Sequence, residues 1–205
     1  MIKGALIELI KESLPQLDKT GKYHDKIVEA YISLAVNTIL GQIFKKDAGN
    51  YDLYAKEYSG TILQDQNTEQ YYSAYPAPIV QTIGPSKGVR SINTTKGQGL
   101  EFAPAQSSDM ALFQDLMASK LSNVIPYIPQ RDRVLYIGEP IDEDYQTITN
   151  VRMLLVVPFT EYDMDEFFHI PEGVDLDIVD TVRQIAGQIP PRDLLNDNKE
   201  KQWKE

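Results

Sequence analysis

The sequence contains no cysteine and only two histidines, His24 and His169. The absence of cysteine excludes disulfides, thiolate nucleophiles, thiolate zinc sites and iron–sulfur ligation. The longest apolar run, Met153–Val157, is far shorter than the roughly 20 residues that a membrane-spanning helix requires. Residues 1–8 lack the features of a secretory signal. We therefore expect synthesis and residence in a cytoplasm, with no membrane association.

Basic residues are also few. The chain has 20 Lys and Arg against 30 Asp and Glu, which gives a formal net charge of -10 and a pI near 4.7. Such a surface repels phosphate, and the basic residues are not gathered in one region, so tight binding of nucleic acid is not expected. With 42% apolar residues among 205, the chain has the composition of one folded domain with a core of its own.

Apolar residues in the first 48 positions recur with the period of a helix. The spacing around Leu6 and Ile10 predicts one helix that ends before Pro15, and a second helix is predicted over residues 22–44. The second helix is apolar over much of its circumference, so we expect partners on more than one side, from its own domain or a neighbouring subunit. Its apolar face is predicted to hold Ile27, Tyr31, Leu34 and Thr38, with Val28, Ala35, Ile39 and Ile43 close by.

The middle of the chain is rich in tyrosine, β-branched residues, glycine and proline, which is typical of short strands and loops. Residues 89–93 and 100–103 flank a loop with two glycines and predict a hairpin. The best strand candidates, residues 133–138 and 147–157, are separated by an acidic, turn-rich segment. They predict a second antiparallel pair.

Two further helices are predicted. Ser108 and Asp109 supply caps for a helix that ends near Ser122, and Asp175 caps a final helix that stops at Pro190. The elements together predict an α+β fold with amino-terminal helices, a mainly antiparallel β core, and a carboxyl-terminal helix with an extended tail.

We expect a single structural domain over residues 1–205. Its parts are a helical arm at 1–48, an α+β core at 50–189 and a carboxyl-terminal tail at 190–205. The tail is polar, so we expect neighbouring molecules to hold it in place. Its apolar residues are Leu194, Leu195 and Trp203.

No arrangement of residues predicts catalysis, and we expect no catalytic residue, cofactor or bound metal. No serine lies in a G-x-S-x-G elbow. His24 and Asp25 are adjacent on a predicted helix, where their side chains diverge, and His169 lies in an apolar context typical of a packed imidazole. Gly84–Lys87 and Gly97–Gly99 lack the full spacing of phosphate and dinucleotide loops, so both are interpreted as turns.

Carboxylates cluster at Asp142–Asp144, Asp163–Glu166 and Asp175–Asp180. Counted from Asp163, the second cluster has Phe168 and Val174 where a calcium loop needs glycine and glutamate. We therefore interpret these clusters as solvated acidic loops. A metal-dependent enzyme stays as an alternative, and it would need convergence of Asp142, Asp144, Asp163 or Asp165 in a cleft.

Tyr71, Tyr72 and Tyr75 precede Pro76 and Pro78. Tyrosines could stack on bases, but stacking without nearby cations makes a poor nucleic acid site. Aromatic residues next to prolines mark core edges or protein interfaces more often. The predicted interface residues are therefore Tyr71, Tyr72, Tyr75, Leu194, Leu195 and Trp203.

Two segments carry a family resemblance. One is Gly88–Ile92 leading to Gly99–Pro104. The other is the final helix with the run that follows it, Pro190-Pro191-Arg192-Asp193-Leu194-Leu195-Asn196-Asp197-Asn198-Lys199. With these segments, the chain resembles structural proteins of tailed phages, especially those of crAss-like podoviruses, and the likeness as a whole extends over about a third of the chain.

The resemblance implies a virion protein of the head–tail connector or tail barrel, assembled in the host bacterial cytoplasm. Such proteins form a homo-oligomeric ring, commonly of about twelve copies, beneath the portal and next to other tail or connector proteins. DNA would pass through without specific binding, and no catalytic residues would carry over. The alternative function is that of an acidic cytoplasmic adaptor or inhibitor that acts by protein–protein binding.

Overall fold

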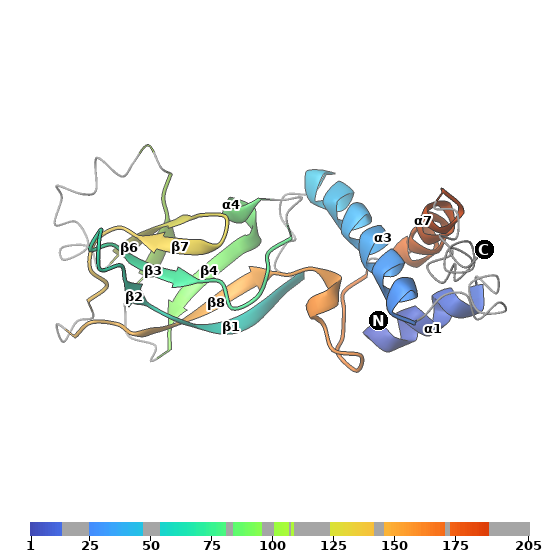
Figure 1. Ribbon diagram of the computed structural model, residues 1–205, viewed down its shortest axis with the longest axis horizontal. Helices are drawn as coiled ribbons and strands as arrows, with labels where there is room; N and C mark the ends of the chain where they lie inside the picture. The colour runs from blue at the N-terminus through green and yellow to red at the C-terminus, as the bar shows by residue number, and fades with distance from the viewer. Residues whose placement is uncertain are drawn as a thin grey trace, which may run out of the picture. The chain divides into compact units, whose positions relative to one another are not determined.

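The computed structural model describes residues 1–13, 25–46, 54–80, 84–95, 101–106, 108, 124–141, 146–170 and 173–188. The chain forms two compact units (Figure 1). We call Met1–Ile39 with Tyr162–Glu205 the helical unit, and Leu40–Glu161 the β unit. The predicted mixed α+β fold is confirmed, with helices before and after the strands.

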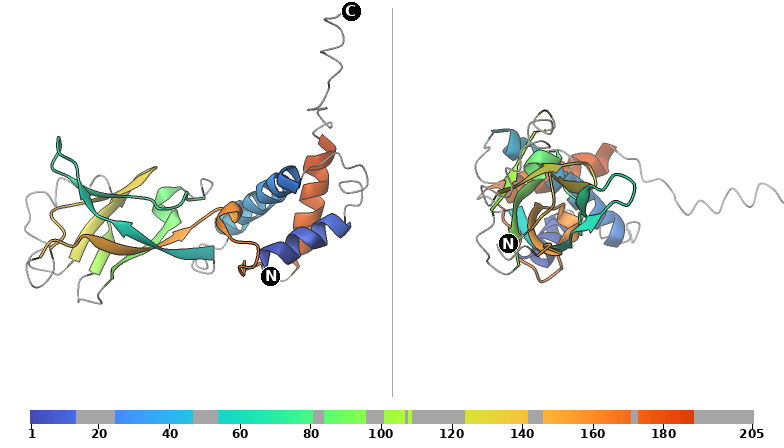
Figure 2. Two further views of the ribbon diagram at one scale, coloured as in Figure 1. Left: turned by 60° about the horizontal axis from the view of Figure 1, so that its bottom comes forward. Right: turned by 90° about the vertical axis from the view of Figure 1, so that its left-hand side faces the viewer.

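Three helices make up the described core of the helical unit, gathered in a bundle (Figure 2). Helix α1 buries Leu6, Ile7 and Ile10, which recur at helical spacing. Helix α7 contacts α1 and buries Ile178 and Val182 one turn apart. All three helices were predicted from the sequence. Their bounds are α1 Lys3–Ser13, α3 Asp25–Lys46 and α7 Val174–Gln188.

Helix α3 buries one broad face, as its sequence predicts, but the position of that face differs from the prediction. Ile32 and Ala35 are fully buried, whereas Leu34 is 52% exposed and Thr38 is also exposed. The apolar residues of this helix allow more than one choice of face, and packing selects the one centred on Ile32, Ala35 and Val36. Leu34 is therefore an apolar side chain left at the surface.

The β unit contains two sheets with separate strand sets. The orders are β1-β8-β4 in a three-stranded sheet and β2-β3-β7-β6-β5 in a five-stranded sheet. Among the described strands, every pairing is antiparallel except β5 with β6, so the prediction of a mainly antiparallel core is confirmed. The strands are β1 Ala55–Thr61, β2 Leu63–Gln64, β3 Tyr71–Ala74, β4 Val89–Thr94, β5 Glu101–Pro104, β6 Val124–Pro129, β7 Arg133–Tyr136 and β8 Asn150–Val156.

The predicted hairpin between residues 89–93 and 100–103 is wrong. Both strands form, but β4 pairs with β8 in the three-stranded sheet and β5 pairs in parallel with β6 in the other. The glycines between them indicate a chain reversal and carry no information on the hydrogen-bonding partner. The partner is chosen by burial of side chains far apart in the sequence.

The predicted pairing of residues 133–138 with 147–157 is also wrong, although both strands form. Strand β7 lies between β3 and β6, and β8 lies between β1 and β4, so each is an inner strand of its own sheet. Val151, Met153 and Leu155 of β8 are fully buried. Two such apolar strands each need partners on both edges, which one hairpin does not provide. Figure 1 shows β1 running beside β8 along its length.

The compact units are bounded differently from the predicted arm, core and tail. Helix α7 stands at the end of the predicted core, yet it belongs to the helical unit because it contacts α1.

Several predictions lie outside the described residues: most of the helix at 108–122, the acidic Asp142–Asp144, His24 and the tail at 190–205. Among the described helices, none is long and apolar enough to span a bilayer.

Candidate functional site

The structure does not bring the three predicted interface tyrosines onto one surface. Tyr71 and Tyr72 are neighbours on β3, so their side chains project from opposite faces of the five-stranded sheet. Tyr75 comes directly after the end of this strand. Each tyrosine therefore has its own surroundings.

Tyr75 forms part of the wall of a groove in the β unit. Its phenol donates a hydrogen bond to the Gln130 carbonyl oxygen at 2.9 Å. Burial raises the pKa of Tyr75 well above its usual range, so the phenol stays neutral. The groove encloses about 840 Å³ and is lined by Tyr75, Pro76, Ala77, Pro78, Ile79, Val80, Gly84, Pro85, Arg131 and Asp132.

The other two tyrosines are half-buried and take part in the sheet. Tyr71 borders a small pocket of about 140 Å³ that also contains Glu69 and Glu139. Burial, and secondly the negative charge of Glu139, raise the pKa of Tyr71. Tyr72 packs against a buried apolar cluster on the opposite face, and the Arg133 guanidinium lies 5.3 Å from its ring centre. Tyr71 and Tyr72 therefore both have contacts within the β unit.

A second surface, which the sequence did not predict, lies in the helical unit. Six large apolar side chains in the described part of the chain are strongly exposed, and five belong to this unit. Three of those five lie on two segments that are hydrogen-bonded to each other, and we call Ile2, Met164 and Phe167 the apolar patch. The exposed fractions are Ile2 46%, Leu34 52%, Met164 54%, Phe167 65% and Leu176 68%, with Leu63 of the β unit at 48%.

The patch is built by strand-like pairing of residues 1–4 with residues 164–168. Ile2 stands opposite Phe167 in an antiparallel bridge. The bridge is flanked by hydrogen bonds from Phe168 N–H to the Met1 carbonyl oxygen at 2.7 Å and from Lys3 N–H to the Glu166 carbonyl oxygen at 3.0 Å. This is the pairing in which opposite side chains approach most closely, so Ile2 and Phe167 lie side by side.

Gly4 places the third member of the patch. Its N–H donates to the Met164 carbonyl oxygen at 2.8 Å. A Cβ at this position would lie 2.9 Å from the same oxygen and 3.9 Å from the Met164 Cε atom. Met164 is therefore held against the first turn of α1, next to the Ile2 bridge.

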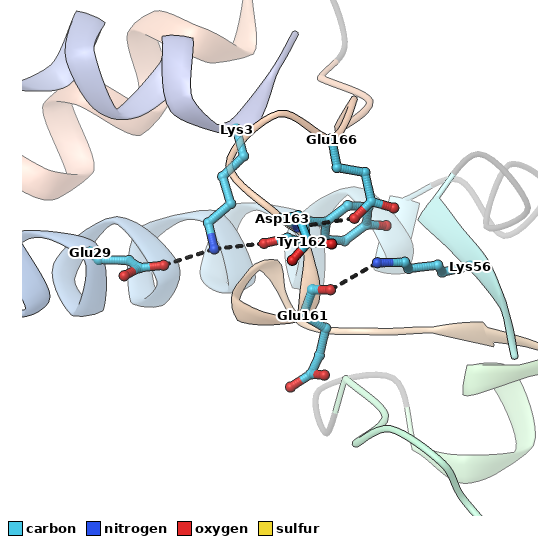
Figure 3. Close-up of polar contacts among 7 residues, drawn as sticks. All are labelled: Lys3, Glu29, Lys56, Glu161, Tyr162, Asp163 and Glu166. Atoms are coloured by element: carbon cyan, nitrogen blue, oxygen red, sulfur yellow. Dashed lines mark hydrogen bonds and ion pairs between the residues drawn. The ribbon is translucent and has the colours of Figure 1, made fainter.

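The buried side chain of Lys3 connects the paired segments of the patch to α3 (Figure 3). Its side chain is only 4% exposed, and its Nζ lies 2.7 Å from Oε1 of Glu29 on α3. The same ammonium donates to the Tyr162 carbonyl oxygen at 2.8 Å. The Tyr162 ring in turn meets the buried Phe168 ring edge to face at 4.9 Å. One buried cation thus ties α1, α3 and the segment after residue 161 together.

Two hydrogen bonds between Asp163 and Glu166 close a turn in the segment that carries Met164 and Phe167. The Asp163 N–H donates to the Glu166 carboxylate at 3.0 Å, and the Glu166 N–H donates to the Asp163 carbonyl oxygen at 3.0 Å. The side chains of Asp163 and Asp165 are exposed. The apolar patch therefore has an acidic border.

The described carboxylates do not assemble into a metal site. No group of three or more His, Asp or Glu residues with metal-binding geometry occurs in the described part of the chain. Asp163 and Asp165 face solvent, and Asp175 and Asp177 lie in the first turn of α7. His169 is half-buried. In the β unit, the Lys56 ammonium is bound to the Glu161 carbonyl oxygen at 3.0 Å (Figure 3).

The remaining predicted interface residues, Leu194, Leu195 and Trp203, lie outside the described residues. The sequence did contain one sign of the patch, the doublet Phe167-Phe168, because consecutive residues of an extended segment face opposite ways. Phe167 pairs with Ile2, however, and most of the chain separates these two residues. The contact therefore leaves no pattern in the sequence near either of them. No model of a known protein family matches the chain, and no curated protein sequence matches it.

Proposed function

We propose that this chain is a structural subunit of a tailed-phage virion. It would form part of the head–tail connector or tail-barrel ring beneath the portal, a conduit for DNA that performs no catalysis. The observation that carries the proposal is the set of exposed large apolar side chains in the helical unit, three of which form the apolar patch.

The apolar patch favours a role in assembly. Single apolar residues at a surface are ordinary, but adjoining ones with a polar border are typical of protein contacts. Ile2, Met164 and Phe167 are each about half exposed or more, and backbone hydrogen bonds between their two segments hold them in place. In a ring, each copy presents one surface to the next copy and a different surface to the previous one. A preformed patch of this kind suits one side of such a contact.

The charge of the chain supports passage of DNA over binding of DNA. The formal net charge is -10, and the described helical unit presents exposed acidic residues beside its apolar patch. A DNA conduit requires weak phosphate contacts, because tight ones would retard the moving duplex. Acidic walls repel phosphate over about 8–10 Å at physiological salt.

Sedimentation velocity of the full chain across a concentration series tests the proposal. We expect a closed assembly of about twelve copies, in keeping with the resemblance to phage connector proteins. Deletion of Arg192–Glu205 should leave a folded monomer and weaken the assembly. A chain that stays monomeric or dimeric at every concentration would contradict the proposal and favour the adaptor or inhibitor function.

A further inference from the structure

We propose that the carboxyl-terminal tail of one copy, residues 189–205, docks on the apolar patch of the neighbouring copy, with Trp203 as its anchor. The inference deepens the proposed function, on which it rests, by naming the two surfaces that meet in the ring. The acceptor is Ile2, Met164 and Phe167, and the donor is the polar end of the chain.

The acceptor requires an apolar anchor. Phe167 is 65% exposed and Met164 is 54% exposed, while their backbones are fixed by hydrogen bonds to residues 1–4. A surface that is already ordered loses little conformational entropy when a ligand binds. A large, rigid side chain with a polar edge suits it best, since such side chains dominate the energetics of protein contacts.

The acceptor also favours lysine beside that anchor. Asp163 and Asp165 are exposed next to the patch. The Lys3 ammonium is buried and paired with Glu29 at 2.7 Å, and the amino-terminal ammonium of Met1 donates to the Phe168 carbonyl oxygen at 2.8 Å. Both positive charges are thus engaged within the unit, and the two exposed carboxylates attract a ligand that brings ammonium groups of its own.

The tail has this chemistry. Trp203 is the only tryptophan in the chain, and Lys201 and Lys204 stand two residues before it and one residue after it. The same stretch also contains Glu200 and Glu205, so the attraction depends on the lysines next to the ring and not on net charge. Leu194 and Leu195 supply a second apolar contact.

The length of the tail permits docking on another copy. Helix α7 ends at Gln188 in the helical unit, the same unit that carries the patch. The 17 residues from 189 to 205 span at most about 60 Å when extended, which exceeds the diameter of a small domain. Exchange of terminal segments is a low-cost way to join neighbours around a ring.

The intrinsic fluorescence of Trp203 tests the docking directly in the full chain, because no other tryptophan contributes. In the assembled protein we expect a blue-shifted emission and protection from acrylamide. Phe167→Ser and Met164→Ser should each weaken docking roughly 10- to 100-fold, as removal of a buried apolar side chain predicts. Leu63→Ser, a change at a similarly exposed site in the β unit, should leave the emission unchanged.

A mixing experiment distinguishes docking on a neighbour from docking on the same copy. A Phe167→Ser chain reports through its own Trp203 but lacks an intact acceptor, whereas a Trp203→Phe chain has the acceptor and no reporter. Mixing the two full-length variants should restore the blue shift, and mixing the Phe167→Ser chain with a Phe167→Ser/Trp203→Phe chain should not. Recovery would show that the tail of one chain occupies the patch of another.

Three outcomes would overturn the inference. They are a solvent-exposed Trp203 in the assembled protein, an emission unaffected by both patch variants, and no recovery on mixing. Sedimentation separates these failures from failure of the proposed function. A ring with an exposed Trp203 would refute only the tail docking, whereas a monomer with a protected Trp203 would refute the ring and place the tail on its own copy.

Discussion

Replacing Lys3 with methionine should destabilise the helical unit strongly. The substitution keeps an unbranched side chain in the buried position and removes the ammonium. That ammonium is bound to Glu29 at 2.7 Å and to the Tyr162 carbonyl oxygen at 2.8 Å. Lys3→Met therefore leaves a carbonyl without its donor and a carboxylate without its cation.

The two losses differ in size. A buried carbonyl that loses its hydrogen bond costs about 1–3 kcal/mol. Breaking a fully buried ion pair costs about 3–5 kcal/mol, but Glu29 is 37% exposed, so water recovers much of that. We expect a loss of about 2–4 kcal/mol in the free energy of unfolding. For a unit of this size, that corresponds to a fall of roughly 10–20 °C in Tm.

Thermal and urea denaturation followed by far-ultraviolet circular dichroism measures the loss, because the helical unit supplies most of the helical signal. Near-ultraviolet tyrosine signals report chiefly the β unit, since most tyrosines lie there. Arg183→Met is the matched control. Arg183 pairs with Asp180 at 2.8 Å, but both side chains are more than 60% exposed, so the change should stay within about 0.5 kcal/mol.

A double-mutant cycle gives the sharpest refutation. In a Lys3→Met background, the further change Glu29→Gln should cost far less than Glu29→Gln alone, because the carboxylate has already lost its partner. Additive effects, or a Lys3→Met variant as stable as the Arg183→Met control, would show that Lys3 does not anchor this unit.

Three further predictions concern packing and pH. Gly4→Ala should destabilise by about 1–3 kcal/mol in urea denaturation, despite the higher helix propensity of alanine, since the new Cβ would lie 2.9 Å from the Met164 carbonyl oxygen. Tyr136→Phe should cost about 1 kcal/mol by the same assay, because the Tyr136 hydroxyl donates to the buried Ser73 hydroxyl at 3.1 Å. Burial raises the pKa of Tyr127 to about 12 from 10.0, so the stability this phenol contributes is complete below pH 10 and lost as pH rises to 12. Absorbance titration near 295 nm should accordingly show a late-ionising tyrosine in the folded chain.

Local periodicity was enough to predict α1, α3 and α7. It did not predict the short helix α4, Pro85–Gly88, which lies where the sequence indicated only a turn. Leu6 and Ile10 on α1, and Ile178 and Val182 on α7, recur every three or four residues and are buried. The period does not fix which side of an apolar helix meets the core. Leu34 illustrates this on α3, because it lies on the predicted apolar face and is 52% exposed.

Four strands, β4, β5, β7 and β8, were also readable from the sequence, whereas their partners were not, and β1, β2, β3 and β6 were not predicted individually. The runs around Val134 and Met153 are strongly apolar and both form strands. Their neighbours across the sheet, however, are set by register and burial over long sequence separations. The sequence near each strand contains turn residues only, and these indicate where the chain reverses without naming the strand it joins.

For the candidate surfaces too, the sequence carries local context but not the contacts between distant segments. Tyr75 was predicted as an interface residue from its aromatic and proline-rich context. It borders a groove, and its place at an interface stays a prediction. The apolar patch was not predicted, because Ile2 and Phe167 become neighbours only through a bridge between distant segments. A surface built by such a contact has no motif in either segment, so only the folded chain reveals it.

Electron microscopy of the native particle that contains this chain tests the ring assembly, because it gives the symmetry order and the number of copies. A connector or tail-barrel subunit should form a closed ring of about twelve copies around an open channel. An isolated monomer or a two-fold dimer in the native setting would contradict it.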